Sequence, residues 1–354
     1  MQGGVHITAM HYCLPNGRVT QSDLETRFTT RQVQSIQKLS GIMERRVVET
    51  GQTAADLAAV AAERLLGAVG FPREEIDLLI FCSQTPDHQL PATACVLHER
   101  LGLKQACAAF DINQGCAAFP YTLAVAAGYL KLGLGRKALL LNADALSRVV
   151  HPLDRGLVTL HGDGACATLL ELGGDDLGIE AVRLGTDGTG WKYIAIPASG
   201  ARMPKGEDES TRKAVVDDSG SVCTQEHLQM NGPAVFQFSI SKVPEVIAET
   251  LAQNRLTMAD LDLVLLHQAN KMMLDIIYRK LGVPEQKQFL FSERIGNLGG
   301  PSVAVVLAEA WRRGKIKPNS RTLLAGFGNG LAWGVTVIHW PATLPPPVLA
   351  PVDF

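Results

Sequence analysis

The sequence lacks a dominant charge of either sign, and only 19% of its 354 residues are charged. Lys and Arg number 33 against 35 Asp and Glu, a formal net charge of −2. Nothing in this balance draws the chain to nucleic acid or to an anionic membrane. It has no run of about 18 uncharged apolar residues, which excludes a membrane-spanning helix. The first twenty residues lack a cationic start followed by an apolar stretch, so we expect no secretory signal.

Paired cysteines and metal-ligand clusters are absent as well. The seven cysteines are an odd number, are scattered, and include no C-x-x-C pair, which favours reduced thiols in a cytoplasmic protein. No group of Cys, His, Asp and Glu has the spacing of a metal site, so we expect no metal and no bound cofactor. Apolar residues are abundant at 46%. This composition excludes disorder and supplies a large core, and the length predicts more than one domain.

The chain contains an internal repeat. An acidic lead-in followed by an apolar run occurs at residues 75–80 and again at 260–265, with Asp77 matched by Asp262. Further on, a Gly115-Cys116 step and a Gly296-Asn297 step each precede an apolar helical segment. Strands alternating with helices predict an α/β fold with parallel βαβ units in two pseudo-symmetric halves.

We therefore divide the chain into three parts. Residues 1–184 form an N-terminal half, and residues 226–354 form a C-terminal half. Between them, residues 185–225 are rich in glycine, proline and charge and predict an irregular connecting excursion. Residues 341–354 contain five prolines and predict a surface arm.

Cys116 is the candidate nucleophile. It follows the apolar run Ala108–Ile112 and stands at the expected first turn of a helix over 117–130. Amide groups at a helix start lower the pKa of a thiol, and the thiolate is the reactive form. The alternative is a buried, inert cysteine, which is the interpretation we give to Cys82, Cys95, Cys107 and Cys166.

His267 and Asn297 are candidate partners of this thiol. His267 ends the apolar run Leu263–Leu266, and strand ends of this kind point into the ligand crevice of α/β proteins. Asn297 occupies the repeat position of Cys116. The alternatives are a histidine that closes a strand and an asparagine that caps a helix. His161 has the same ambiguity and no helix-start partner. A thiol, an imidazole and a carboxamide together suit thioester chemistry.

Residues 326–334 form a glycine-rich loop, Gly-Phe-Gly-Asn-Gly-Leu-Ala-Trp-Gly, flanked by apolar runs. Such a loop allows close backbone approach to a ligand and leaves an N–H as an oxyanion donor. A dinucleotide-binding loop would be followed by a helix, whereas the residues after this loop read as a strand.

In order along the chain, these motifs resemble the ketoacyl-acyl-carrier-protein synthase III family of the thiolase fold. The likeness covers nearly the whole chain. Its motifs are Gly41-Ile42 with Arg45-Arg46, Thr85-Pro86-Asp87, Phe110-Asp111, Gly115-Cys116, Asp154-Arg155-Gly156, Gly162-Asp163-Gly164-Ala165, His267-Gln268-Ala269-Asn270 and Gly296-Asn297. The resemblance implies a layered αβαβα architecture and a condensing activity on thioesters of coenzyme A or acyl carrier protein.

The resemblance also implies roles for individual residues. Cys116 would accept the acyl group, and the backbone N–H groups of Cys116 and Asn329 would form the oxyanion hole. His267 and Asn297 would bind the malonyl thioester carbonyl and stabilise the enolate left by decarboxylation. Asn270 would orient His267.

Binding and assembly follow from the same resemblance. Arg155 stands where the family stacks on the adenine of coenzyme A. The family's enzymes are typically homodimers, and Leu90 stands where a residue lines the partner's acyl pocket. A phenylalanine is common there, so the smaller Leu90 predicts room for acyl chains longer than acetyl.

Several positions depart from the family pattern. Asn329 replaces the middle glycine of the loop, which a positive φ would accommodate. Ser35 stands where an adenine-stacking tryptophan is frequent. Three positions that are often basic are Leu39, Gln237 and Met272, while Arg279, Lys280 and Lys242 remain as candidates for docking an acidic carrier.

The leading hypothesis is a decarboxylative Claisen condensing enzyme in fatty-acid or specialised, polyketide-like or alkylresorcinol-like, biosynthesis. The alternative is an acyltransferase on the same fold that moves an acyl group to a hydroxyl or amine. A degradative thiolase would need a second catalytic cysteine near the last loop, and no cysteine follows Cys223. A non-catalytic subunit would be expected to lack the nucleophile.

Overall fold

Two β-sheets organise the molecule. The computed structural model describes residues 3–174, 177–217, 220–344 and 352–354. The strands of the first sheet are, in spatial order, β16 (Val352–Asp353), β1 (Val5–Leu14), β7 (Asp163–Leu172), β6 (Lys137–Ala145), β4 (Leu78–Cys82) and β5 (Ala108–Ile112). Those of the second are β13 (Leu263–Leu266), β14 (Arg321–Gly328), β15 (Ala332–His339) and β8 (Gly178–Thr186).

The pairing of these strands repeats between the sheets. In the first sheet β4 is parallel to β6, which is antiparallel to β7, which is antiparallel to β1. In the second, β13 is parallel to β14, which is antiparallel to β15, which is antiparallel to β8. In the first sheet, β5 pairs in parallel with the outer edge of β4. At the corresponding edge of β13, the described part of the second sheet has one parallel bridge, between Val264 and Gln288. The predicted repeat is confirmed, but the sheets are mixed, because the last strands of each unit pair as antiparallel neighbours.

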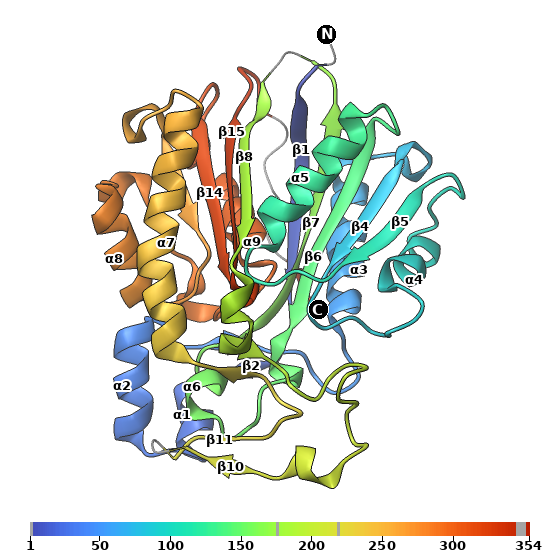
Figure 1. The fold of residues 1–354 in the computed structure, drawn as a ribbon. Helices are drawn as coiled ribbons and strands as arrows, with labels where there is room; N and C mark the ends of the chain where they lie inside the picture. Colours follow the sequence, from blue (N-terminus) through green and yellow to red (C-terminus); the bar gives the residue numbers. More distant parts are fainter. Residues whose placement is uncertain (1–2, 175–176, 218–219, 345–351) are drawn as a thin grey trace.

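Helices and sheets alternate in five layers (Figure 1). Helices α3 (Ala54–Val69) and α4 (Thr93–Arg100) cover the outer face of the first sheet. Helices α5 (Ala118–Lys131) and α9 (Ser302–Arg312) lie between the two sheets. Helices α7 (Gly232–Gln253) and α8 (Lys271–Leu281) cover the outer face of the second sheet. This arrangement is the αβαβα architecture expected from the sequence.

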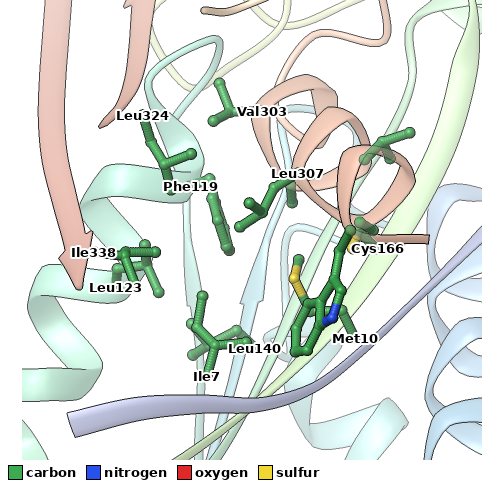
Figure 2. Close-up of a cluster of buried hydrophobic side chains, with 14 of the residues drawn as sticks. Ile7, Met10, Phe119, Leu123, Leu140, Cys166, Val303, Leu307, Leu324 and Ile338 are labelled. Atoms are coloured by element: carbon green, nitrogen blue, oxygen red, sulfur yellow. The ribbon is translucent and has the colours of Figure 1, made fainter. Parts of the chain in front are cut away.

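The central layer forms a core shared by both halves. Every residue of α9 from Ser302 to Trp311 is buried, as its almost wholly apolar sequence predicts. Figure 2 shows side chains from both sheets and both central helices meeting in this core: Ile7, Met10, Phe119, Leu123, Leu140, Cys166, Val303, Leu307, Leu324 and Ile338. Burying this apolar surface holds the two halves together.

The change from one sheet to the other occurs before β8. Residue 184, our boundary from the sequence, lies inside this strand, which pairs with β15 of the second sheet. At the other end of the chain, β16 returns to the first sheet and pairs in parallel with β1. Of the predicted surface arm, residues 345–351 lie outside the described part of the chain.

Smaller elements gather at the lower end of the molecule in Figure 1. They include α1 (Gln21–Glu25), α2 (Thr30–Ser40), α6 (Arg155–Val158) and the two-residue strands β2 (Arg18–Val19) and β3 (Arg45–Arg46). The excursion after β8 carries β9 (Ile194–Ala195), β10 (Val215–Val216), β11 (Val222–Cys223) and β12 (Gln229–Met230), and continues to the start of α7. Among the helices in the described ranges, none combines the length and apolar character needed to span a membrane.

Candidate active site

Cys116 lies in the short connection between β5 and α5. The helix begins at Ala118, so Cys116 precedes it by two residues rather than standing in its first turn. The amide of Ala118 donates to the carbonyl oxygen of Gly115, 2.7 Å away, which turns the chain tightly at the cysteine. The connection brings the sulfur to the carboxyl end of the first sheet, as the sequence predicts.

The environment of the Cys116 thiol raises its pKa to about 12. Burial is the largest cause, and the nearby Asp144 carboxylate adds to it. The backbone N–H groups of Asn329 and Cys116 face the sulfur and act in the opposite direction without overcoming burial. The expected lowering by a helix start is therefore wrong for this structure. Both amides of the expected oxyanion hole lie at the sulfur.

The glycine loop closes over the cysteine. A Cβ at Gly328 would lie 2.7 Å from the Sγ of Cys116, and one at Gly326 would lie 2.6 Å from its carbonyl oxygen. The left-handed dihedral of the loop falls on Gly330, with φ 127°, and Asn329 is not among the residues of positive φ. Asn329 therefore needs no positive φ to be accommodated, because the neighbouring glycine adopts the unusual conformation instead.

The side chain of Asn329 begins a buried hydrogen-bond chain that the sequence did not reveal. Its Nδ2 donates to Oε1 of Gln84 at 3.0 Å, and Nε2 of Gln84 donates to Oδ2 of Asp144 at 2.7 Å. The amide of Gly300 donates to the same carboxylate oxygen at 2.7 Å. Burial raises the pKa of Asp144 to about 6. One sequence signal was available, because Asn142 and Asp144 interrupt an otherwise apolar strand end.

His267 directly follows β13 and is buried. Its amide donates to the carbonyl of Ala325 at 2.8 Å, and its ring lies edge-on to Phe327 with centroids 5.7 Å apart. Burial lowers the pKa of His267 to about 3, with a smaller contribution from His161. The imidazole is therefore neutral at physiological pH.

Asn270 does not hold His267 in this conformation. Its Oδ1 accepts a hydrogen bond from the amide of Met273 at 2.9 Å and caps the N-terminus of α8. The Nδ1 of His267 has no hydrogen-bond partner among the residues that the structure describes. The contact expected between these two side chains is absent here, although both line the same cavity.

Asn297 is held by backbone and side-chain contacts. Its amide donates to Leu160 and its carbonyl accepts from Gly162, both at 2.9 Å. Its Oδ1 accepts from the amide of Gly299 at 3.0 Å, which leaves Nδ2 as the group available to donate. Since α9 begins at Ser302 after the N-cap Pro301, Asn297 is not a helix cap and stands farther from its helix than Cys116 does.

His161 joins the site, contrary to the sequence analysis. The residue forms a parallel bridge with Asn297, and its Nδ1 lies 3.4 Å from the Asn297 carbonyl oxygen. Burial lowers the pKa of His161 to about 4. Sequence reasoning set it aside because no helix starts beside it, whereas the contact with Asn297 spans the two halves of the chain.

These groups line one cavity of about 360 Å³. Cys116, His267, Asn297 and Asn329 lie at its walls. The remaining lining is mostly apolar and includes Leu160, Ile194, Met230, Phe236, Met273 and Phe327. Within the described ranges, no Asp, Glu, Lys or Arg lines this cavity. Its lining is mostly apolar, and residues of α7 and α8 form part of its wall.

The predicted binding residues lie outside this cavity. Leu90 is 88% exposed in the loop between β4 and α4, and Arg155 is the first residue of α6. Arg279 and Lys280 are exposed in the last turn of α8, where Nζ of Lys280 donates to the carbonyl of Ile240. Lys242 pairs with Glu245 and lies over the ring of Trp333.

Comparison with known proteins identifies the family of this chain. Residues 110–188 match the family model described as 3-oxoacyl-[acyl-carrier-protein] synthase III, and residues 251–340 match the model of its C-terminal part. The beta-ketoacyl-[acyl-carrier-protein] synthase III of Caldanaerobacter subterraneus is 35% identical over 327 residues, covering 92% of this chain and 95% of the relative. The chain belongs to the 3-oxoacyl-[acyl-carrier-protein] synthase III family.

Other members extend this family relationship. The synthase III of Rhodopirellula baltica is 35% identical, and the match covers 95% of this chain and 99% of that protein. A crystal structure of a 3-oxoacyl-(acyl-carrier-protein) synthase III superposes with a TM-score of 0.92 at 35% identity, covering 95% of this chain and all of the other. The priming β-ketosynthase of the R1128 polyketide pathway superposes with a TM-score of 0.84 at 28% identity, and the match covers 98% of each chain.

Proposed function

We propose that this synthase III family member condenses acyl thioesters. An acyl group is loaded on Cys116 and then joined to a malonyl thioester by decarboxylative Claisen condensation, giving a β-ketoacyl-type product. The observation that carries the proposal is the meeting of Cys116, His267 and Asn297 in one apolar cavity, with two backbone amides at the sulfur.

In the first step, the Cys116 sulfur adds to the carbonyl carbon of the acyl thioester. The bond to the leaving thiol then breaks, and the proton of Cys116 departs with that thiol. The amides of Cys116 and Asn329 supply two donors for the oxyanion. A thiol with a raised pKa is protonated at physiological pH, so its proton passes to the leaving sulfur as the thioester carbonyl is attacked.

In the second step, His267 and Asn297 act on the malonyl thioester. The imidazole N–H and the Nδ2 of Asn297 donate to the thioester carbonyl oxygen while the carboxylate leaves as carbon dioxide. The resulting enolate carbon attacks the acyl carbonyl on Cys116, and the cysteine sulfur is released as a thiolate that takes up a proton from solvent. A neutral His267 suits this role, because it donates a hydrogen bond without placing a charge in an apolar cavity.

The two steps are expected to separate by mutation. Cys116→Ala should lose acyl loading and condensation but retain some malonyl decarboxylation. His267→Ala and Asn297→Ala should still acquire an acyl group on Cys116, while decarboxylation falls about a hundred- to a thousandfold. Intact-protein mass spectrometry after incubation with acyl thioesters measures the loading, and release of labelled carbon dioxide measures decarboxylation.

One outcome would replace condensation with the acyltransferase alternative. If His267→Ala abolishes acyl loading and Asn297→Ala turns over normally, His267 is the base of a Cys–His transferase that passes the acyl group to a hydroxyl or amine. The pathway served, fatty-acid or polyketide-like, then follows from which thioesters load Cys116.

We infer that Arg279 and Lys280 contact an acidic carrier protein. Both are exposed at the end of α8, while Leu39 and Met272, two of the positions where the family is often basic, offer no charge. Reversing both charges should raise KM for a carrier-bound donor and leave a coenzyme A donor nearly unchanged, because only the protein donor presents an acidic surface. Lys131→Glu, an exposed reversal at the end of α5, is the control. Equal effects on both donors would refute the docking role.

We also infer that the enzyme works as a homodimer in which Leu90 lines the partner's acyl pocket. The observation in support is an apolar side chain that is 88% exposed in the single chain. Light scattering measures the mass in solution, and a C2 to C12 panel of acyl thioesters measures chain length. Leu90→Phe should shift loading toward shorter chains, whereas a monomer, or loading of acetyl alone by the wild type, would contradict this inference.

A further inference from the structure

A second cavity lies behind the candidate active site, among the small elements at the lower end of Figure 1. Its volume is about 390 Å³, and five basic or titratable side chains line it: Arg27, Arg45, Arg148, His161 and His227. In the part of the chain that the structure describes, no Asp or Glu lines this cavity. Three arginines around one cavity form a positive site.

Arg45 is the central feature of this cavity. Its side chain in β3 is only 1% exposed, yet none of its three guanidinium nitrogens has a hydrogen-bond partner among the described residues. Burial and the charge of Arg27 lower its pKa to about 10, so the group remains charged at physiological pH. A buried charge without hydrogen bonds is strongly unfavourable, and an anion bound against it would remove that cost.

The other arginines are held in place by backbone carbonyls and not by carboxylates. Arg148 donates through Nη2 to the carbonyls of Glu49 and Gln52, and Arg27 donates through Nη1 to that of Pro152. The acid that acts on Arg45 is Asp23 of α1, which lies at the surface and caps its own helix through Thr20. Behind the lining, the carboxylate of Asp163 accepts hydrogen bonds from Val48 and Ser147 and interacts with the charge of Arg148. The charges of Arg27 and Arg45 have no such carboxylate within the described lining.

The cavity is connected to the candidate active site through two residues. His161 lines both cavities and forms the wall between them. The stem of Arg45 packs where a Cβ on Gly296 would lie, 2.8 Å from its Cγ, and Gly296 immediately precedes Asn297. The side chain that would hold a ligand in this cavity is thus packed against the residue that precedes Asn297.

We propose that this second cavity binds a phosphoryl dianion. The planar guanidinium of Arg45 offers paired donors that match two oxygens of a phosphate. Arg45 neutralises one negative charge of the dianion, and Arg27 and Arg148 neutralise the other. The dianion has two possible sources, free inorganic phosphate or a phosphate of the coenzyme A part of a thioester substrate. Only the second source rests on the function proposed above.

Calorimetric titration with inorganic phosphate, at an ionic strength held constant with chloride, tests the free source. We expect wild-type protein to bind phosphate and Arg45→Met to bind it ten- to a hundredfold more weakly, as loss of a charge-assisted contact implies. Arg148→Gln and Arg27→Gln should also weaken phosphate binding. These two variants test the proposal if Arg45→Met fails to fold. Arg31→Gln, an exposed arginine of α2, is the matched control.

The second source is tested with coenzyme A and 3′-dephospho-coenzyme A. If the substrate supplies the dianion, Arg45→Met and Arg148→Gln weaken the binding of coenzyme A but not that of the dephospho form. The proposal is overturned if phosphate binds no better than chloride and the variants treat both coenzymes alike. Failure of acyl loading on Cys116 would refute the proposed function and leave the phosphate titration valid.

Discussion

At the scale of single residues, burial sets the ionisation of the reactive groups. Cys116 and Asp144 have raised pKa values, and His161 and His267 have lowered ones, each with burial as the largest cause. All four groups are thereby shifted toward their uncharged forms. A site kept this nearly neutral suits a step in which charge develops on the substrate and is stabilised by fixed hydrogen-bond donors.

The lowered histidine pKa values predict acid sensitivity. His161 has a pKa of about 4 in the folded chain and an ordinary value near 6.5 when unfolded. The unfolded state therefore binds more protons below pH 6.5, and stability falls as the pH is lowered toward the folded value. At pH 5 this costs about 2 kcal/mol relative to pH 7.5.

His161→Phe should lack that loss, as measured by urea unfolding at the two pH values. Asp144 acts with the opposite sign, because its raised pKa favours the folded state as the pH falls. Since Asp144 is present in both the wild type and the variant, its contribution cancels when their pH dependences are subtracted. Replacement of the exposed His88 by Gln is the control. An unchanged pH dependence in His161→Phe would show that His161 is protonated in the folded state.

At the scale of elements, the decisive feature is the contact between the glycine loop and the β5–α5 connection. The loop joins β14 to β15, so its position depends on the second sheet, while Cys116 depends on the first. Gln84 strengthens this contact from a third segment by linking Asn329 to Asp144. The site exists only where the two sheets meet at their carboxyl ends.

Glycine substitutions test this contact. Gly328→Ala should abolish acyl loading, because the added methyl would lie 2.7 Å from the sulfur of Cys116 and must displace it. Gly128→Ala in α5 meets nothing within 4 Å and should raise the free energy of unfolding by about 0.5 to 1 kcal/mol, with activity retained. Mass spectrometry of Cys116 and chemical denaturation provide the readouts. Normal acyl loading in Gly328→Ala would contradict the close packing.

At the scale of the whole molecule, the two halves share the core drawn in Figure 2. The helices α5 and α9 are packed against both sheets, so neither half can bury its inner face without the other. We therefore expect a single cooperative unfolding transition although the chain contains a structural repeat.

Leu307→Ala is the matching test. Leu307 is fully buried in α9, and its truncation should lower the free energy of unfolding by about 2 to 5 kcal/mol without splitting the transition. Leu132→Ala, at a position 77% exposed, should change it by less than about 0.5 kcal/mol. Calorimetry and circular dichroism report the transition, and two separate transitions in Leu307→Ala would show that the halves fold independently.

The sequence by itself determined the repeat, the order of elements and the placement of Cys116 and His267 at strand ends. These follow from short-range patterns, since an apolar run and the residue that ends it are neighbours in the chain. The composition of the glycine loop also predicts a close backbone approach, which the structure places at Cys116. The family resemblance agrees with the comparisons for the same reason, because its motifs are local.

Only the tertiary structure decided the electrostatics of the site and the residues that complete it. The pKa of Cys116 rises where a helix-start argument predicts a fall, because enclosure by both sheets outweighs two amide contacts. His161, Gln84 and Arg45 acquire their surroundings from segments far away, as Gln84 does from Asn329, 245 residues along the chain. Burial and through-space contact depend on which distant segments pack together, and no local pattern in the sequence records that.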